Sequence, residues 1–180
     1  IGATDSKPIA YQKITGSESQ QILIPVGKCD IYIVANYKGA KFDANTTRTI
    51  LEEETFTDEA VLEQPFVMLG VYSGVMISRE GKIMYGGTDI TQNIKLERVA
   101  AKVTLNLNAA ETVVIDSVCI NNRASVSFLI PDKPHTSGAT NNKNVKLETP
   151  GNTYSFYLPE YIVNEEHKTK STYVTVYAQV

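Results

Sequence analysis

Few side chains in this chain have types and spacing that could support chemistry. The two histidines, His135 and His167, each lie in a polar stretch. Neither has a second His or Cys at the spacing that zinc sites use. They could be metal ligands, but a histidine in a polar loop is more often simply solvated. We therefore predict no metal site.

Carboxylates and glycines give two further patterns. Glu165 and Glu166 precede His167, but a glycosidase site would need a second acid on a rigid strand, and none can be nominated. Residues 86–89, Gly-Gly-Thr-Asp, resemble a phosphate-binding turn, yet no helix pattern follows to supply a dipole. Nucleophile-elbow, Walker and zinc-protease motifs are absent from the sequence. These observations predict a protein that is not an enzyme and binds no cofactor.

Charge and hydropathy argue against a protein that binds nucleic acid or anionic lipid or that spans a membrane. The formal net charge is −3 and the sequence pI is near 5.4, so there is no basic field for nucleic acid or anionic lipid. Lys95, Arg98 and Lys102 are close in sequence, but Glu97 interrupts them. They favour a solvated strand face; the alternative is a basic side chain offered to a protease or a partner subunit. The sequence contains no apolar run of the ~20 residues that span a bilayer.

The sequence leaves open whether the two cysteines are free thiols or form a disulfide. Cys29 and Cys119 each lie in a β-patterned run, which favours buried free thiols. One disulfide between them, linking the two halves of the chain, remains the alternative.

Strand patterns dominate the elements that must position these side chains. The clearest period of two runs from residue 99 to residue 107, with one apolar face formed by Val99, Ala101, Val103 and Leu105. That face is either ordinary core or a strand that contacts another subunit. We expect further strands at 21–24, 31–36, 66–71, 75–77, 82–85, 112–120, 124–130, 153–158 and 173–180. A short helix is expected near 45–54, capped by Asn45 or Thr46.

Many short strands separated by turns predict an all-β fold of antiparallel sandwiches. We expect two tandem β-sandwich domains with one or two short helices, at residues 1–90 and 91–180. The chain starts without Met or a basic leader and stops within the strand pattern 173–180. We therefore expect a processed N-terminus and an incomplete second domain.

Three ordered segments resemble the fimbrillins, the pilins of the type V pili of Bacteroidia. They are Ile24-Pro-Val-Gly-Lys-Cys-Asp-Ile-Tyr-Ile-Val-Ala-Asn36, Leu96-Glu-Arg-Val-Ala-Ala-Lys-Val-Thr-Leu-Asn-Leu107 and Phe156-Tyr-Leu-Pro-Glu-Tyr161. The chain departs from the family pattern at Cys29, where Tyr is usual, and at Tyr161, where Asn is usual.

The resemblance implies two transthyretin-like domains and a structural subunit of a cell-surface fimbria at the outer membrane. It further implies a secreted lipoprotein precursor cut by an arginine-type protease, with contact to the membrane only through a lipid anchor that is later removed. Cleavage would leave an apolar groove that a strand of the next subunit fills, so other pilin subunits are the expected partners. The face formed by Val99, Ala101, Val103 and Leu105 is the candidate contact strand.

Two other functions stay open. A surface adhesin module, as a tip or accessory subunit, would bind host glycan or protein and would gather exposed aromatics such as Tyr72, Tyr85 and Tyr161. A β-sandwich hydrolase is the third hypothesis, which the missing catalytic constellation disfavours.

Overall fold

The computed structural model describes residues 7–16, 21–39, 42–57, 64–130, 143–148, 151–163 and 165–180. The chain divides into two compact units. Unit 1 comprises residues 1–54 and 67–98, and unit 2 comprises residues 55–66 and 99–180. The chain therefore passes between the units after residues 54, 66 and 98. The domain bounds 1–90 and 91–180 stay a prediction, since these units are defined by their internal contacts.

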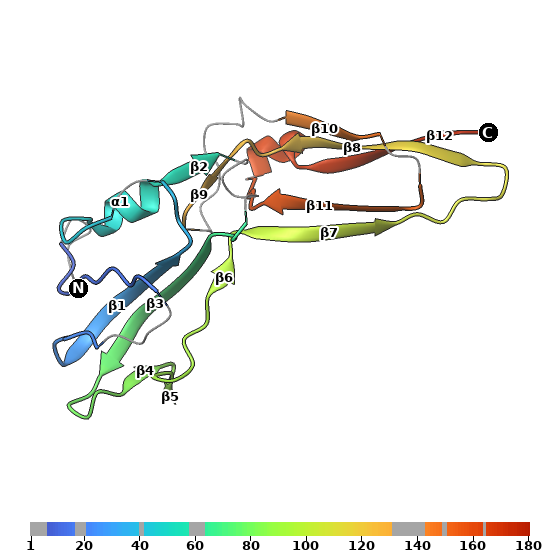
Figure 1. The fold of residues 1–180 in the computed structure, drawn as a ribbon. Coiled ribbons are helices and arrows are strands. Elements are labelled where there is room, and N and C mark those ends of the chain that lie inside the picture. Colours follow the sequence, from blue (N-terminus) through green and yellow to red (C-terminus); the bar gives the residue numbers. More distant parts are fainter. Residues whose placement is uncertain are drawn as a thin grey trace. The chain divides into compact units, whose positions relative to one another are not determined.

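Unit 1 is built on one antiparallel sheet (Figure 1). Its long strands are β1 (Gly27–Ala35) and β3 (Met68–Ile77), followed along the sheet by β4 (Ile83–Tyr85) and β5 (Thr88–Asp89), while β6 (Glu97–Arg98) pairs with β3. Val75 and Ile77 are buried on one face and Leu69 on the other. Both faces of β3 thus contribute to the core of this unit, as the apolar run at 66–71 suggests.

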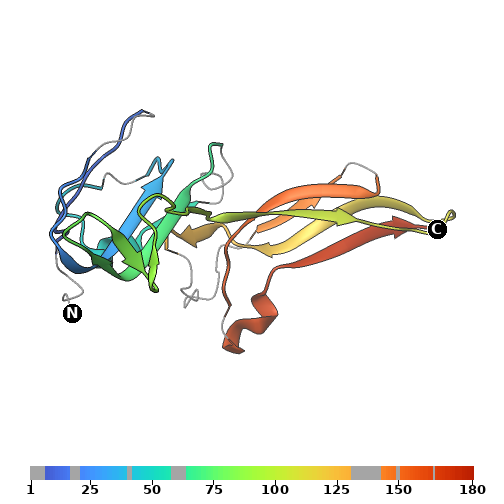
Figure 2. The same ribbon diagram turned by 90° about the horizontal axis from the view of Figure 1, so that it is seen from below.

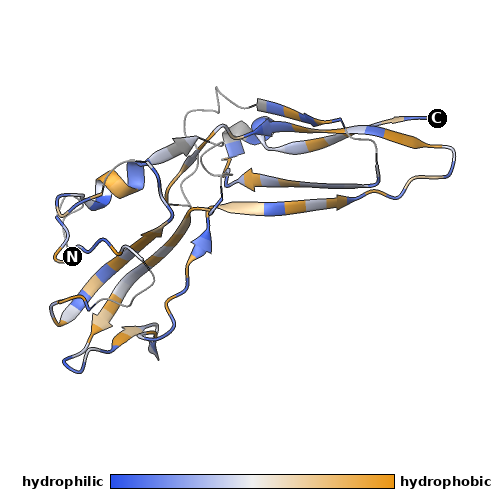
Figure 3. Cartoon of the chain, in the orientation of Figure 1, coloured by the Kyte–Doolittle hydropathy of each residue, from blue (hydrophilic) through white to orange (hydrophobic). Residues whose placement is uncertain are grey.

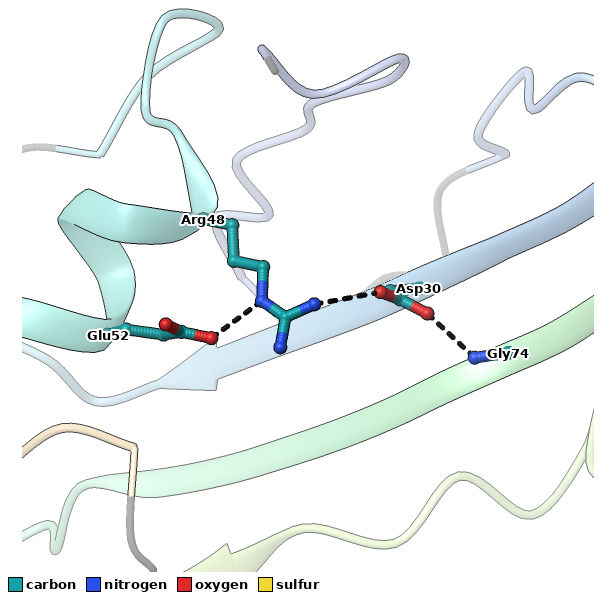
Figure 4. Close-up of polar contacts among 4 residues, drawn as sticks. All are labelled: Asp30, Arg48, Glu52 and Gly74. Carbon is teal, nitrogen blue, oxygen red and sulfur yellow. Dashed lines mark hydrogen bonds and ion pairs between the residues drawn. The ribbon is translucent and has the colours of Figure 1, made fainter. Parts of the chain in front are cut away.

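A polar cluster connects the short helix α1 (Arg48–Glu53) to this sheet (Figure 4). The pairing of β1 with β3 shifts register between Cys29 and Ile31, next to Asp30. There the Gly74 amide donates to Asp30 Oδ1 at 2.7 Å, and Arg48 lies 3.5 Å from Asp30 Oδ2. Arg48 Nε also donates to Glu52 at 2.6 Å. The cluster satisfies an amide at the irregular register and anchors the helix beside it.

A second contact fastens the segment before β6 across β3. Tyr72 Oη donates to the Lys95 carbonyl at 2.7 Å and accepts from the Lys95 amide at 2.6 Å. Beneath this segment lies Gly70, where a Cβ would stand 2.9 Å from Leu96 Cδ2 and 3.0 Å from the Lys95 oxygen. Only glycine leaves room for so close a crossing.

The described residues of unit 2 form three antiparallel sheets. One has the order β10 (Lys143–Leu147), β8 (Val114–Arg123), β12 (Tyr173–Gln179). The second pairs β11 (Thr153–Pro159) with β7 (Ala100–Asn106), and the third pairs β2 (Thr55–Thr57) with β9 (Val126–Phe128). A 3₁₀ helix, Glu165–Lys170, precedes β12.

The core of unit 2 lies between the first two of these sheets. Ile115 and Val118 of β8 are buried against Tyr154 of β11. Leu105 of β7 and Leu147 of β10 pack against this cluster. Apolar faces of two antiparallel sheets in contact define a β-sandwich.

The predicted all-β antiparallel fold with short helices is confirmed. Strands occur in each expected region except 21–24, where the prediction was wrong: residues 21–25 have no regular secondary structure. The helix cap was also misplaced. Thr47 caps α1 and accepts from the Ile50 amide, because Asn45 and Thr46 hydrogen-bond to Asp43 in the preceding turn.

Candidate functional site: an open strand position in unit 2

β12 lies at the edge of its sheet and is exposed along most of its length. Within the described part of the chain, β12 pairs only with β8. Its side chains divide into two rows according to their partners on β8. Val174 and Val176 stand opposite Ile120 and Val118, which are fully buried, so this row faces the interior of the sandwich.

This inward row of β12 is incompletely covered. Val174 is 38% exposed and Val176 is 42% exposed, whereas their partners on β8 are 0% exposed. Figure 2, which looks from the side of β7 and β11, shows no described strand in front of β12. The sheet of β7 and β11 therefore covers β8 but leaves β12 uncovered.

β7 forms the other border of this uncovered region. Among the described strands, β7 pairs only with β11, so one of its edges has free backbone groups. Val103 and Leu105 lie opposite the buried Phe156 and Tyr154, so they point inward. Orange and blue bands alternate along β7 in Figure 3, as expected for a strand with one apolar and one polar face.

We call the place beside the free edge of β7 and over the inward row of β12 the open strand position. Val103, Leu105, Val174 and Val176 line it, and none of these carries a charge. A strand added there would gain backbone hydrogen bonds from β7 and would cover the valines of β12.

The four residues predicted as a contact face occupy different places in unit 2. Val103 and Leu105 are half-buried on β7 and border the open strand position. Ala101 is exposed and lies opposite Leu158. Val99 precedes the strand and is buried at 3% exposure, so it belongs to the core. The valines of β12 were missed, because the sequence gives their alternation but not the fact that none of the described strands covers them.

The outward row of β12 has another character. Tyr173, Thr175 and Tyr177 stand opposite Asn121, Cys119 and Ser117. Asn121 Nδ2 donates to Thr175 Oγ1 at 2.9 Å and to the Cys119 carbonyl at 3.3 Å. On this side Asn121 thus has hydrogen-bond partners, while Tyr173 and Tyr177 are exposed at 55% and 49%.

The other residues singled out from the sequence do not form a catalytic site. Over the described residues, no three His, Cys, Asp or Glu side chains come together as metal ligands. His135 lies outside the described residues, as does the side chain of His167. Glu165 pairs with Lys168, which is a surface ion pair.

Both cysteines are free, so the structure contains no disulfide between Cys29 and Cys119. Burial, and then the adjacent Asp30 carboxylate, raise the pKa of the Cys29 thiol. Such a thiol is protonated near neutral pH and is a poor nucleophile.

The aromatic residues considered for ligand binding divide between the units. Tyr72 and Tyr85 pack edge to face in unit 1, with ring centroids 5.3 Å apart. Tyr161 belongs to unit 2.

In the described residues, no helix is long and apolar enough to cross a membrane.

This arrangement of antiparallel strands has a counterpart among solved structures. The chain is similar to the tip fimbrial protein Mfa3 from Porphyromonas gingivalis, solved with a C-terminal truncation. The TM-score is 0.60 at 20% sequence identity, over 93% of this chain and 68% of that one. No family model and no curated protein sequence matches the chain. The fimbrillin-like fold expected from the three sequence segments is therefore confirmed.

Proposed function

We propose that this protein is a structural subunit of a cell-surface fimbria and that it joins a neighbouring subunit by accepting a strand at the open strand position. The observation that carries the proposal is the exposure of Val174 and Val176 beside an edge of β7 with which no described strand pairs. An exposed apolar row beside an unpaired strand edge is costly in a monomer and useful in an assembly. The fold that the chain shares with a fimbrial protein supports the same role.

The energetics fit a joint between subunits. Burying a valine side chain fully contributes roughly 1.5–3 kcal/mol, and each net ladder hydrogen bond about 0.5–1.5 kcal/mol. Two or three side chains and a few hydrogen bonds exceed the lower estimates of the association cost, about 4 kcal/mol. A longer donor strand would make the joint tighter and its dissociation slower.

Val176→Arg is the variant that tests this proposal. At 42% exposure, the arginine head can reach water in the monomer, but an added strand would bury it. Tyr177→Arg is the matched control, because Tyr177 is 49% exposed on the outward row of the same strand. Multimer ladders on unboiled gels, and filaments in negative stain, should form with wild type and with Tyr177→Arg. They should be lost with Val176→Arg, and equal ladders for both variants would contradict the proposal.

The resemblance also supports a processing route. We propose that the protein reaches the outer membrane as a lipoprotein precursor and that an arginine-specific protease triggers strand exchange. Limited trypsin treatment of the precursor should then produce ladders that untreated precursor lacks. Ladders of equal strength without cleavage would remove the trigger from the proposal but leave strand acceptance intact.

The adhesin alternative has a narrower basis. The pair Tyr72 and Tyr85 is the observation that favours it, since Tyr85 is 41% exposed and could stack on a sugar. However, the Tyr72 hydroxyl is already held by the Lys95 backbone. A glycan array probed with Tyr85→Ala beside wild type would decide whether this pair binds glycan.

A further inference from the structure

Unit 2 is assembled from two separate segments of the sequence. Residues 55–66 belong to unit 2, whereas the residues on both sides of them, up to 54 and from 67 to 98, belong to unit 1. Within 55–66, β2 pairs with β9, and the Phe66 ring packs on Tyr157 of β11 with ring centroids 4.7 Å apart. Unit 2 therefore needs a segment that a stretch of unit 1 separates from the rest of it.

The two ends of that stretch are held together within unit 1. The pairing of β3 with β6 places Met68 opposite Arg98. Tyr72 of β3 fastens the same segment, since its hydroxyl hydrogen-bonds the Lys95 backbone. The chain crosses to unit 2 after residues 66 and 98, so both crossings lie within two residues of this pair. Folded unit 1 thus presents the two segments of unit 2 from neighbouring points.

The residues that flank the crossings are held by their own units. Glu54 is the C-cap of α1, and the residue after it begins β2. Val67 is 4% exposed and Val99 is 3% exposed, so the residues that follow the other two crossings are buried at once. These connections are therefore shorter and more ordered than the flexible linkers that usually join domains.

We infer that the paired exits of unit 1 act as a clasp that couples the folding of the two units. With unit 1 unfolded, residues 55–66 and 99–180 must meet across a loop of about 30 residues, whose closure entropy scales as (3/2)RT ln n. The clasp removes most of this cost, which corresponds to on the order of a hundredfold in the equilibrium constant for folding of unit 2. By linkage, folded unit 2 stabilises unit 1 by the same factor.

The consequence is that neither unit opens alone at low cost. Domains that follow one another along a chain and share a single flexible linker can unfold one at a time. Here the opening of unit 1 would release the clasp and weaken unit 2 as well. The coupling is a property of the monomer, so it goes beyond the proposed role in a fimbria.

Flexible insertions test the clasp in the full chain. A Gly/Ser insertion of about twelve residues between Arg98 and Val99 separates the exits that unit 1 holds together. Hydrogen exchange followed by mass spectrometry should then show the protection of β8 reduced at least about fivefold. The same insertion after Glu80, in the exposed turn between β3 and β4, is the matched control and should leave the protection of β8 unchanged.

A third insertion distinguishes the clasp from local damage at a crossing. Placed between Glu54 and Thr55, it leaves the pair of Met68 and Arg98 to hold the other two exits together. The protection of β8 should therefore fall less than with the insertion after Arg98. Equal losses from these two insertions, or no loss from either, would overturn the inference.

Unfolding unit 1 measures the full coupling. Val75→Asp places a charge at a position of β3 that is 0% exposed, whereas Met76→Asp, at 48% exposure on the same strand, is the control. Val75→Asp should lower the protection of β8 by on the order of a hundredfold or unfold unit 2 outright, and Met76→Asp should leave it unchanged. If β3 exchanges freely while β8 keeps its wild-type protection, the units fold independently and the inference fails. Exchange is measured on the monomer, so this result does not depend on strand acceptance.

Discussion

Val118 and Val176 form a register pair whose substitution tests the open strand position in the monomer. Both valines face the interior of unit 2, one on the central strand β8 and the other on the edge strand β12. Val118 is 0% exposed and Val176 is 42% exposed. Replacing either by alanine removes the same two methyl groups, so the difference in cost reports how well each position is covered.

The expected costs follow from burial. Two methyl groups moved out of water are worth about 1.6 kcal/mol, at roughly 0.8 kcal/mol for each carbon. At Val118 the packed surroundings add a cavity term, giving a loss of about 2–3 kcal/mol. At Val176 little more than half of the side chain is covered and water can enter the space, so the loss should stay below about 1 kcal/mol.

Urea denaturation of monomeric protein measures both losses. Far-ultraviolet circular dichroism and tyrosine fluorescence serve as probes, because the chain has ten tyrosines and no tryptophan. Unchanged m-values would show that the substitutions altered stability and not the denatured state. If Val176→Ala costs as much as Val118→Ala, the inward row of β12 is covered in the monomer and the reasoning about an open strand position is refuted.

Three further outcomes are expected from unit 1. Tyr72→Phe should lower the free energy of unfolding by about 1–2 kcal/mol, because it removes both hydrogen bonds to the Lys95 backbone; an unchanged urea midpoint would contradict this role. Asp30→Ala should cost about 1 kcal/mol through the Gly74 amide, whereas Asp30→Asn, which can still accept that hydrogen bond, should cost less in the same urea titration. Because the pKa of Cys29 is raised in the folded state, its contribution to stability is complete below the unfolded pKa near 8.5 and declines as the pH rises above it. Alkylation of Cys29 near pH 8.5, followed by mass spectrometry, should be slower in the folded chain than in urea, and Asp30→Asn should accelerate it; equal folded and unfolded rates would refute the shift.

Strands with strong alternation could be predicted from the sequence because local pattern and tertiary burial agree. The run from residue 99 to 107 became β7, and the glycine turn after residue 77 became the turn between β3 and β4. Its Ser78 oxygen accepts from the Lys82 amide, which closes the turn. Such features depend on neighbours in sequence, so they are visible without the structure.

Elements that depend on distant partners could not be predicted. β10 lies at the end of a polar stretch that reads as loop, and its pairing with β8 stabilises it as a strand. β2 has only three residues and pairs with β9, some seventy positions later. Residues 21–24 show the opposite error, because strand propensity without a partner does not make a strand. The open strand position belongs to this class, since the exposure of Val176 depends on which of the described strands pack against β12.

The two rows of β12 bear on how a docked strand would find its register. A slip by one residue turns every side chain of an incoming strand to the opposite face. Val174 and Val176 carry no charge, so the inward row of β12 is best covered by a strand whose apolar side chains all lie on one side. One register of such a strand is therefore favoured over the slipped one, and the open strand position can select a specific strand although it offers no charged group for recognition.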